Sequence, residues 1–449
     1  MPLFRILQPI YHFLLSWLAA VFYCFPSEKL IVIGITGTTG KTTTVYLLAK
    51  ILESAGFKVG FTSTAMFNNG QREWLNDKKM TMVGRFFTQK ILRQMVKNGC
   101  QYAIVETTSE GIRQFRHRFI NYDIVLLTCL YPEHIESHGS FENYKRAKGK
   151  LFAHLKKCRP KYVNEKKQVM KPATGLKKIE LERVKKKIIV NGDDEHASYF
   201  LNFWAEEKIA YSQRGQVFGI KDLKIIPYGE IKPSATGTSF KIRGAKINLP
   251  FLGSFNAMNA AAAISVGLAE GLSLEVIKNG LEKIQGVPGR LEKIDEGQDF
   301  TVIVDYAFEP KAVAKLYETI ALLPHKKIIH VLGSAGGGRD AARRPVLGRI
   351  AGERADYVIV TNEDPYDDDP ETIISQVALG AEKTGKRTGE NLFKILDRRK
   401  AIKKALDLAQ AGDLVLITGK GSEQAICVAG GEKIPWDDRA VVRDLLLGA

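Results

Sequence analysis

The sequence predicts an α/β protein with two sheet domains. The central domain opens with a glycine-rich loop and has a parallel sheet, and a C-terminal α/β domain follows. Three observations support this fold class. Apolar runs of strand length alternate with helical patterns in two separate series along the 449 residues. A glycine-rich turn follows the first apolar run, and a polar, glycine-rich stretch at 286–298 separates the two series.

The first series begins at 29–36 with a short run rich in β-branched residues, which is typical of a buried strand. Further strand-type runs occur at 102–106, 123–128 and 187–191, and helical patterns occur at 41–54, 86–97 and 141–155. Strands that alternate with helices imply a parallel sheet with helices on both faces.

Two consecutive helical patterns, at 256–271 and 274–284, close the first series. The second series has strand-type runs at 300–306, 327–332, 356–361 and 413–418, separated by helical patterns at 310–322, 345–354, 371–380 and 398–411. We therefore predict an apolar N-terminal segment at 1–28, a central domain at 29–297 and a C-terminal domain at 298–449.

The composition is that of an ordinary globular protein, with 45% hydrophobic and 26% charged residues. The chain is long enough to bury more than one core. Its five cysteines include no CxxC pair, which disfavours a disulfide framework and a cysteine-rich zinc site. A reducing, cytoplasmic setting fits this cysteine usage.

Positive charge is concentrated in one stretch of the chain. The formal net charge is +17, and the stretch 156–187 alone holds thirteen Lys and Arg against three Glu, a net +10. We interpret this stretch as a solvated loop or ribbon between a helix and a strand; the alternative is a contact with phosphate or a membrane surface. Because aromatic residues do not alternate with the basic ones, we expect no nucleic-acid partner.

The N-terminal segment 3–26 is mostly apolar. Its uninterrupted run, 13–25, has 13 residues, fewer than the roughly 20 that a helix needs to span a bilayer. Two interpretations remain open. The segment is either a helix in the membrane interface, with Tyr11, Trp17 and Tyr23 as anchors, or a helix that covers the core of the next domain or a partner.

The turn after the first strand reads GITGTTGKTTT, residues 34–44. It follows a strand and opens a helix, which is the context of a phosphate-binding loop, although the strict pattern would have Gly in place of Ile35. Backbone N–H groups in such a loop hold phosphate oxygens. We expect Lys41 to reach the terminal phosphates and Thr42 to bind Mg²⁺. The expected nucleotide contacts of the loop are Gly37, Thr38, Thr39, Gly40, Lys41, Thr42 and Thr43.

Five motifs occur in the order found in the Mur ligase family. They are GITGTTGKTTT, the stretch TCLYPEHIESHGSFENYKRAKGKLF at 128–152, GSFNAMNAAAA at 253–263, PGRLE at 288–292 and VDYAFEP at 304–310. The chain resembles this family over roughly 30–445 and is most similar to its tripeptide-synthetase branch. The resemblance implies a P-loop central domain and a Rossmann-like C-terminal domain. It also implies an ATP-dependent amide ligase that acts through an acyl-phosphate in peptidoglycan synthesis. We expect the protein in the cytoplasm, with the inner face of the membrane as the alternative that the apolar N-terminal segment raises.

The resemblance also implies a metal site. Glu106 and His134 match metal-binding residues of the family, beside Thr42. Lys148 matches the lysine that the family carries as a carbamate, an anion that can lie beside Mg²⁺. Taken without the resemblance, His134 reads as a surface histidine and Lys148 as an ordinary lysine on a helix face.

Other positions follow the same match. Asn256 and Asn259 correspond to asparagines beside the nucleotide, with helix capping as the alternative. Arg290 corresponds to an arginine that meets ATP phosphate, and Asp305 to an aspartate that holds the nucleotide. Substrate contacts are implied for six further residues of the C-terminal domain. These are Arg339, Arg344, Glu363, Asp364, Gly421 and Glu423.

Three departures from the family pattern affect substrate recognition. The family's N-terminal UDP-binding domain, of roughly a hundred residues, does not precede the loop. The family's DNPR-type motif reads Glu363-Asp364-Pro365-Tyr366, without the arginine that reads diaminopimelate, so lysine or ornithine suits these acidic side chains better. The following acidic run 367–369 is either part of that site or a solvated loop. The third departure is Phe308, where the family has histidine.

The expected partners are therefore small molecules: ATP, an amino acid and a muramoyl-peptide-like acceptor. Two alternatives differ in function. One is a ligase for another acceptor, such as a poly-γ-glutamate or a lipid-linked molecule. The other is a nucleotide-binding partner subunit without ligase activity, which the complete set of Glu106, His134 and Lys148 argues against.

Overall fold

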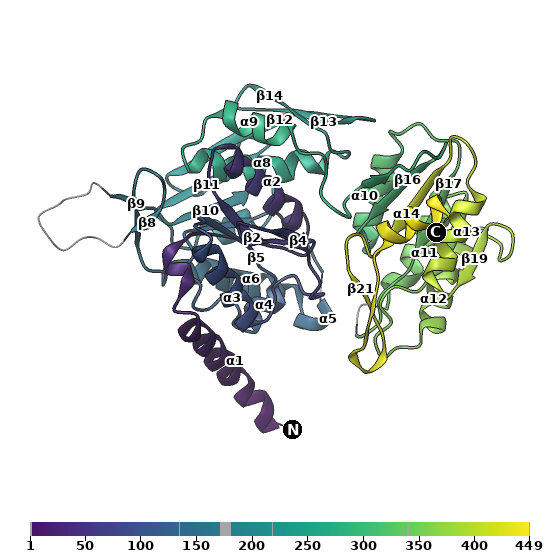
Figure 1. The fold of residues 1–449 in the computed structure, drawn as a ribbon, viewed down its shortest axis with the longest axis horizontal. Coiled ribbons are helices and arrows are strands. Elements are labelled where there is room, and N and C mark those ends of the chain that lie inside the picture. The colour runs from purple at the N-terminus through teal and green to yellow at the C-terminus, as the bar shows by residue number, and fades with distance from the viewer. Residues whose placement is uncertain (1, 134, 171–180, 218, 339–340, 449) are drawn as a thin grey trace, which may run out of the picture.

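A computed structural model describes residues 2–133, 135–170, 181–217, 219–338 and 341–448. Within these residues, the strands form an eleven-stranded sheet, a six-stranded sheet and two small sheets (Figure 1). Helices flank both large sheets, so the predicted α/β fold is confirmed. The six-stranded sheet lies to the right of the larger one in this view.

The large central sheet is mixed. Its inner strands are parallel, and antiparallel strands extend both edges. In spatial order its strands are β14 (Ala245–Leu249), β13 (Gly237–Ile242), β12 (Leu223–Ser234), β11 (Glu207–Ser212), β10 (Lys187–Asn191), β6 (Ile124–Leu127), β1 (Ile31–Thr36), β5 (Tyr102–Glu106), β2 (Val59–Thr62), β3 (Met66–Asn68) and β4 (Glu73–Leu75).

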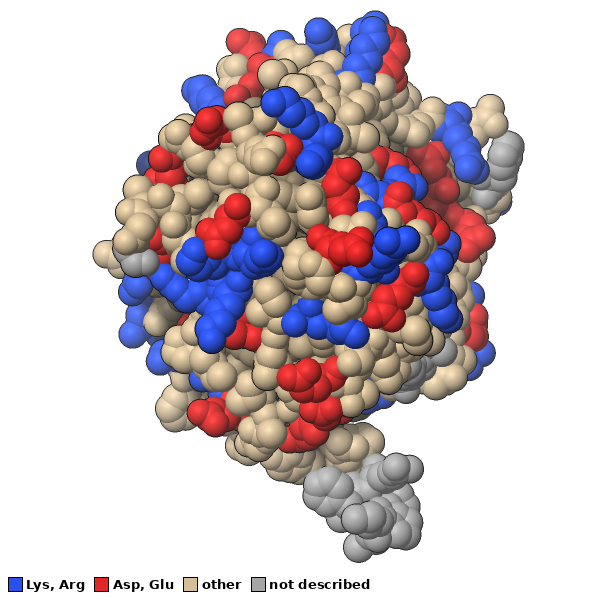
Figure 2. Space-filling model, turned by 90° about the vertical axis from the view of Figure 1, so that its right-hand side faces the viewer, with Lys and Arg blue, Asp and Glu red and all other residues tan. Residues whose placement is uncertain are grey.

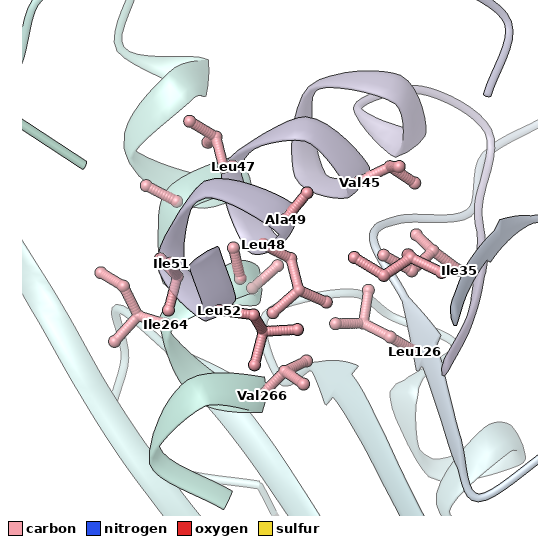
Figure 3. Packing of buried hydrophobic residues seen from close by; sticks show 14 of the residues in the cluster. Ile35, Val45, Leu47, Leu48, Ala49, Ile51, Leu52, Leu126, Ile264 and Val266 are labelled. Carbon is pink, nitrogen blue, oxygen red and sulfur yellow. The ribbon is translucent and has the colours of Figure 1, made fainter. Parts of the chain in front are cut away.

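The described helices of this part begin at the N-terminus. They are α1 (Pro2–Phe22), η1 (Pro26–Lys29), α2 (Lys41–Ser54), α3 (Arg85–Lys97), α4 (Ser109–Arg113), α5 (Ile135–His138), α6 (Phe141–Leu155), α7 (Ala197–Leu201), α8 (Phe255–Ala269) and α9 (Leu274–Glu282). Because side chains alternate along a strand, β1 sends Ile33 and Ile35 into the core under α2 and α8, and Val32 into the core on the opposite face. Figure 3 shows the first core, where Leu48 and Leu52 of α2 lie near Leu126 and Val266.

The C-terminal sheet is parallel except for its first strand. Its spatial order is β15 (Glu292–Ile294), β16 (Thr301–Asp305), β20 (Leu414–Thr418), β17 (Ile328–Leu332), β18 (Tyr357–Thr361) and β19 (Leu392–Ile395). The helices are α10 (Pro310–Ile320), α11 (Arg343–Arg354), α12 (Pro370–Glu382), α13 (Arg398–Leu408), η2 (Ala429–Gly431) and α14 (Asp438–Leu447). The strand β15 lies just before the domain boundary predicted at 297.

Two cores again cover the two faces of this sheet. Leu316 of α10 and Val377 of α12 belong to one core, and Ile402 of α13 and Val442 of α14 to the other. A small hairpin, β21 (Ala425–Cys427) and β22 (Lys433–Pro435), follows the last parallel strand. Figure 2 shows that residues of both charge signs are spread over the face of this domain.

The basic stretch 156–187 forms a β-ribbon in its described part. Its strands are β7 (Lys161–Val163), β8 (Val169–Met170) and β9 (Glu182–Val184), and residues 171–180 lie outside the described residues. The basic side chains are not all solvated, because Lys161 and Lys186 are buried against Asp123, at 2.5 and 2.8 Å. Part of the charge therefore supports the fold, because it neutralises a buried carboxylate.

The same Asp123 carboxylate accepts a hydrogen bond from the backbone N–H of Val32 in β1, at 2.9 Å. Lys161 also donates to the carbonyl oxygen of Leu30, at 2.7 Å. This buried cluster of one carboxylate and two lysines joins the amino end of β1 to the residue before β6 and to the ribbon. Burial lowers the pKa of Lys161, and the Asp123 charge opposes that shift.

The helix α1 projects from the central domain toward the bottom of Figure 1. Its C-terminal part contacts the domain, and the buried Ser16 hydroxyl donates to the carbonyl oxygen of Phe115, at 3.0 Å. Among the residues that the structure describes, no helix has the length and apolar character to cross a membrane.

Candidate active site

The loop between β1 and α2 is shaped by two glycines. Gly40 has φ of 79°, and a Cβ there would lie 2.3 Å from Oδ1 of Asn259. A Cβ on Gly37 would lie 1.9 Å from Oγ1 of Thr128. Both positions therefore need glycine. Because Gly40 precedes α2 without a side-chain cap, the first N–H groups of this helix are available to a phosphate ligand.

The threonines of the loop hold it against the segment that follows β6. The N–H of Thr38 donates to the carbonyl oxygen of Cys129 at 2.8 Å, and the Thr128 hydroxyl donates to the carbonyl oxygen of Thr39 at 2.6 Å. Thr43 is buried in the first turn of α2. These hydrogen bonds hold the loop in its conformation.

The side-chain nitrogens of two lysines converge on one carbonyl oxygen of this loop. Nζ of Lys41 lies 3.1 Å from the oxygen of Gly37, and Nζ of Lys148 lies 2.8 Å from the same oxygen. Burial lowers the pKa of Lys148 well below its ordinary value, and the charge of Lys41 lowers it further. Lys148 comes from α6, where Ser140 caps the first turn by accepting from the N–H of Asn143.

Glu106, at the carboxyl end of β5, lies next to this pair of lysines in the fold. Its buried carboxylate accepts the Thr42 hydroxyl at 2.9 Å and both the N–H and the hydroxyl of Thr64, at 2.8 and 2.9 Å. Since the Thr64 hydroxyl has only one proton, it accepts the hydrogen bond from the Thr81 hydroxyl, at 2.9 Å. Thr64 and Thr81 were not predicted, because nothing in the sequence marks these threonines of a turn as neighbours of Glu106.

The carboxylate and hydroxyl oxygens of Glu106 and Thr42 are ligands of the kind that Mg²⁺ prefers. His134 lies outside the described residues, so the third predicted ligand has no described position. Among the described residues, no group of three or more His, Cys, Asp or Glu side chains could hold a metal ion. The fit to Mg²⁺ therefore depends on the Thr42–Glu106 pair beside the loop.

The two asparagines at the start of α8 do not cap the helix. The Asn259 amide donates to Oδ1 of Asn256 at 3.0 Å, and Asn256 donates to the carbonyl oxygen of Leu252 at 2.8 Å. Oδ1 of Asn259 is buried without a hydrogen-bond partner among the described residues, and it faces Gly40 of the loop. The asparagine pair therefore leaves an acceptor beside the phosphate loop.

A pocket of about 660 Å³ lies next to Asn256 and Arg290, lined from both domains. The Arg290 guanidinium lies over the ring of Tyr306, 4.2 Å from its centroid. Asp305 accepts the N–H groups of Leu291 and Ala307, each at 2.7 Å, and so joins the PGRLE motif to the VDYAFEP motif. Burial raises the pKa of Asp305, and the Arg290 charge opposes this shift.

The predicted amino-acid residues form a second cluster in the C-terminal domain. Asp364 accepts from Lys420 and Lys79, both at 2.8 Å, and Glu423 accepts from Lys420 at 2.9 Å and from Lys79. Burial would raise the pKa of Asp364, but the two lysines lower it. Burial would lower the pKa of Lys79, but the two carboxylates raise it.

Lys79 belongs to the central domain, so this contact joins the two domains. A second such contact lies beside the loop, where Nζ of Lys311 from α10 is 4.8 Å from the ring centroid of Tyr131. Neither lysine was predicted. Lys420 was also missed, although its place inside the GKGSE motif was a signal, whereas Lys79 lies in a short turn that carries none.

Glu363 is buried beside this cluster, and its Oε2 has no hydrogen-bond partner among the described residues. Burial raises the pKa of Glu363, and the charge of Asp364 raises it further. Gly421, with φ of 52°, packs against the carbonyl oxygen of Gly289, where a Cβ would approach to 2.7 Å. A buried carboxyl group without a partner is complementary to a cationic ligand.

The structure does not bring Arg344 to this cluster. Its guanidinium donates to Gln376 at 2.8 Å and to Asp368 at 3.1 Å. The acidic run 367–369 is thus partly engaged within the domain, and Asp369 caps α12. Arg339 lies outside the described residues.

Comparison with known proteins agrees with this arrangement. A phosphate loop and a buried carboxylate in one α/β domain, followed by a second domain with an ammonium-binding acidic cluster, define an ATP-dependent acid–amino-acid ligase. Residues 35–267 match the Mur ligase middle domain, and residues 289–421 match the Mur ligase glutamate ligase domain. The chain belongs to the Mur ligase family, so the predicted family and its ligase activity in peptidoglycan synthesis are confirmed.

Relatives extend the similarity over nearly the whole chain. It is 38% identical over 440 residues to a UDP-N-acetylmuramyl-tripeptide synthetase of Roseiflexus sp. (strain RS-1), covering 96% of this chain and 81% of that protein. It is 33% identical to a UDP-N-acetylmuramoyl-L-alanyl-D-glutamate–2,6-diaminopimelate ligase of Geobacillus kaustophilus, covering 95% and 81%. The similarity to the tripeptide-synthetase branch agrees with the prediction.

Solved structures show the same fold. A diaminopimelate ligase of the same description superposes with a TM-score of 0.57 at 27% identity, covering 94% of this chain and 79% of that one. The folylpolyglutamate synthase of Mycobacterium tuberculosis superposes with a TM-score of 0.65 at 16% identity, covering 96% and 94%. The second similarity shows the fold alone.

Proposed function

We propose that this ligase joins a diamino acid to a muramoyl-peptide-like carboxylate, with ATP and Mg²⁺. One observation carries the proposal: Lys41 and Lys148 meet at the carbonyl oxygen of Gly37, next to the Thr42–Glu106 pair. The cationic Lys41 and hard oxygen ligands around a phosphate loop are what phosphoryl transfer needs. The acceptor carboxylate oxygen attacks the γ-phosphorus of ATP, the bond to ADP breaks, and an acyl-phosphate forms.

The second step joins the amine to this acyl group. The amine nitrogen attacks the acyl carbon, inorganic phosphate leaves, and the nitrogen loses a proton. Thr42, Glu106 and His134 would hold Mg²⁺, which supplies positive charge against the phosphates. Lys41 donates hydrogen bonds to the terminal phosphate, and the N–H groups at the start of α2 orient it.

Lys148 is proposed to act as a carbamate. Only a neutral amine adds to CO₂, and burial together with the nearby Lys41 lowers the pKa of Lys148 toward that neutral form. In the reaction a bond forms between Nζ and the carbon of CO₂, and Nζ loses a proton. The product is an anion beside the carboxylate of Glu106, as a cation site requires.

The nucleotide base and ribose are proposed to occupy the pocket beside Asn256 and Arg290. Its volume of about 660 Å³ is suited to a nucleotide. Asn259 would accept a hydrogen bond through its unpartnered Oδ1, and Asp305 would hold the Arg290 loop in place.

The amino acid is proposed to bind at the acidic cluster. Asp364 and Glu423 already hold the ammonium groups of Lys79 and Lys420, so they accept the kind of group that an amino acid presents. Glu363 adds a buried carboxyl group for a second ammonium. We favour lysine or ornithine, because Tyr366 stands where the family has the arginine that reads diaminopimelate.

Diaminopimelate is the second candidate, because several relatives, at 31–34% identity, are named as diaminopimelate ligases. The acceptor is proposed to carry UDP or a lipid carrier, and the reaction to take place in the cytoplasm. A poly-γ-glutamate acceptor and a non-catalytic partner subunit are the remaining alternatives.

Release of ADP tests these proposals. The protein is incubated with ATP and with UDP-linked or lipid-linked muramoyl dipeptide, plus lysine, ornithine or diaminopimelate, and Lys41→Ala is the control. We expect ADP and a peptide product with lysine or ornithine. A product with diaminopimelate alone would contradict the proposed amino acid, and the absence of amino-acid-dependent ADP with every acceptor would favour the partner-subunit alternative.

A further inference from the structure

Helix α1 carries its large apolar side chains on the exposed side. Six residues at spacings of three and four form one face of the helix, which we term the apolar stripe. The stripe consists of Ile10, Leu14, Trp17, Leu18, Val21 and Phe22, which are 42 to 71% exposed. Residues 8–25 include no Lys, Arg, Asp or Glu. A solvated helix would have polar residues on this face.

The opposite face of α1 is attached to the central domain. The Phe13 ring lies 5.2 Å from the ring of Phe119, and the Ser16 hydroxyl donates to Phe115. Ala19 and Ala20 are fully buried in this contact. Phe13 and the small residues Ser16, Ala19 and Ala20 thus face the protein, while the six residues of the apolar stripe face outward. Burial of this face attaches the C-terminal half of α1 to the domain from which the helix projects (Figure 1), while the apolar stripe stays exposed.

Arginines surround this attachment. Arg118 lies over the Phe13 ring, 5.5 Å from its centroid, and Arg113 is exposed at the end of the preceding helix α4. Burial lowers the pKa of His12 in α1, and the charges of Arg85 and Arg116 add to this, which places both guanidinium groups near the middle of the helix. The acidic group among them is Glu110, which pairs with Arg113 at 3.2 Å. Four arginines against one glutamate leave a net charge of +3.

We propose that α1 is an in-plane membrane anchor that binds an anionic lipid surface through the apolar stripe. An uncharged stripe with a tryptophan, beside a cationic rim, matches the acyl and headgroup layers of such a surface. A specific protein partner would require polar contacts to fix its register. Because one side of α1 is attached to the domain, the helix lies in the plane of the interface. This inference does not depend on which acceptor or amino acid the ligase uses.

Vesicle flotation of the full chain tests the proposal. Vesicles of phosphatidylglycerol and phosphatidylcholine are compared with phosphatidylcholine alone, at low and high salt. The test variant is Leu18→Glu. The matched control is Leu379→Glu on α12, because the two leucines are 46% and 47% exposed. Circular dichroism melting of each variant verifies its fold.

We expect the wild type and Leu379→Glu to float with anionic vesicles, and less at high salt. Leu18→Glu should lose binding by about tenfold or more, the order expected for a leucine side chain that no longer enters the bilayer. Equal binding by Leu18→Glu and the wild type would overturn the proposal. The proposal would also be overturned if the wild type did not bind the vesicles. In that case, a loss of self-association in Leu18→Glu would assign the apolar stripe to a contact between copies of the chain.

Tryptophan fluorescence gives a second readout that needs no destabilising change. Trp17 is one of four tryptophans and belongs to the apolar stripe. Anionic vesicles should shift the emission of the wild type to shorter wavelength, and Trp17→Phe should remove that shift. A shift that persists in Trp17→Phe would assign vesicle contact to another part of the protein and contradict the proposal.

Discussion

The phosphate loop and the acidic cluster differ in the groups that their lysines contact. At the loop, Lys41 donates to the neutral carbonyl oxygens of Gly37 and Thr38, so its positive charge is not cancelled by a bonded carboxylate. In the acidic cluster, Lys79 and Lys420 are paired with Asp364 and Glu423, and the four charges sum to zero. The first arrangement is complementary to an anion, whereas the second binds a new ammonium only by displacing one it already holds.

The largest effect is expected at the loop. Lys41→Ala removes the ammonium group next to the terminal phosphate, and kcat should fall by about a thousandfold or more. The fold should be retained, because the glycines and threonines define the loop backbone. Steady-state ADP release and circular dichroism measure the two effects, with Lys50→Ala on the same helix as the control. Turnover close to wild type would contradict the phosphate-loop assignment.

Lys148→Ala should also inactivate the enzyme, by about a hundredfold or more, because the proposed carbamate anion is lost. A short carboxylic acid in the buffer should restore part of the activity by occupying the space that the side chain leaves. Lys150→Ala, at an exposed lysine of the same helix, should not respond to the acid. If Lys148→Ala is inactive and no carboxylic acid restores it, a carbamate role is not supported.

At the acidic cluster the expected effects are smaller. Glu423→Gln changes the sum of the four charges from zero to +1, so the KM for the amino acid should rise by about ten- to a hundredfold, as for one charged hydrogen bond. The KM for ATP should not change. Initial rates over a range of amino-acid concentrations separate the two constants, and Glu432→Gln is an exposed control. A rise in the KM for ATP alone would contradict the proposed role of the cluster.

Lys79→Met should act in the opposite direction. It leaves the cluster at −1 and removes the ammonium that competes with the substrate, so the KM for the amino acid should fall by a factor of about three to ten. Lys78→Met, at the adjacent exposed lysine, is the control. The double variant Lys79→Met/Glu423→Gln restores a neutral sum and should return the KM toward the wild-type value. An increase with Lys79→Met would show that this lysine helps to bind the amino acid.

The same contrast explains what the sequence could predict. Lys41 and Thr42 stand in one contiguous motif after a strand, so their position follows from local chain geometry. Glu106 and Lys148 were reached only through the family resemblance, because a lysine inside a helix pattern carries no mark of burial. Lys79 meets Glu423 across two domains, and no local signal indicates such a contact.

The strands also differ in how far the sequence could predict them. The buried parallel strands β1, β5, β6 and β10 were predicted from apolar runs. The edge strands β12 to β14 were missed, because one face of each is solvated and their sequences alternate between polar and apolar residues. The basic stretch was predicted as a loop or ribbon, but its buried lysines could not be told from the solvated ones.

The buried cluster of Asp123, Lys161 and Lys186 fixes the starting position of β1. It holds the amino end of β1 through the N–H of Val32. The strand then extends about 13 Å to Thr36, where the loop begins, so the position of Val32 determines the position of the loop. An extended strand cannot stretch, so a displacement at Val32 reaches the loop at full size. A slip of one residue would also exchange the two faces of β1. The position of the phosphate loop thus depends on a charge cluster at the opposite end of β1.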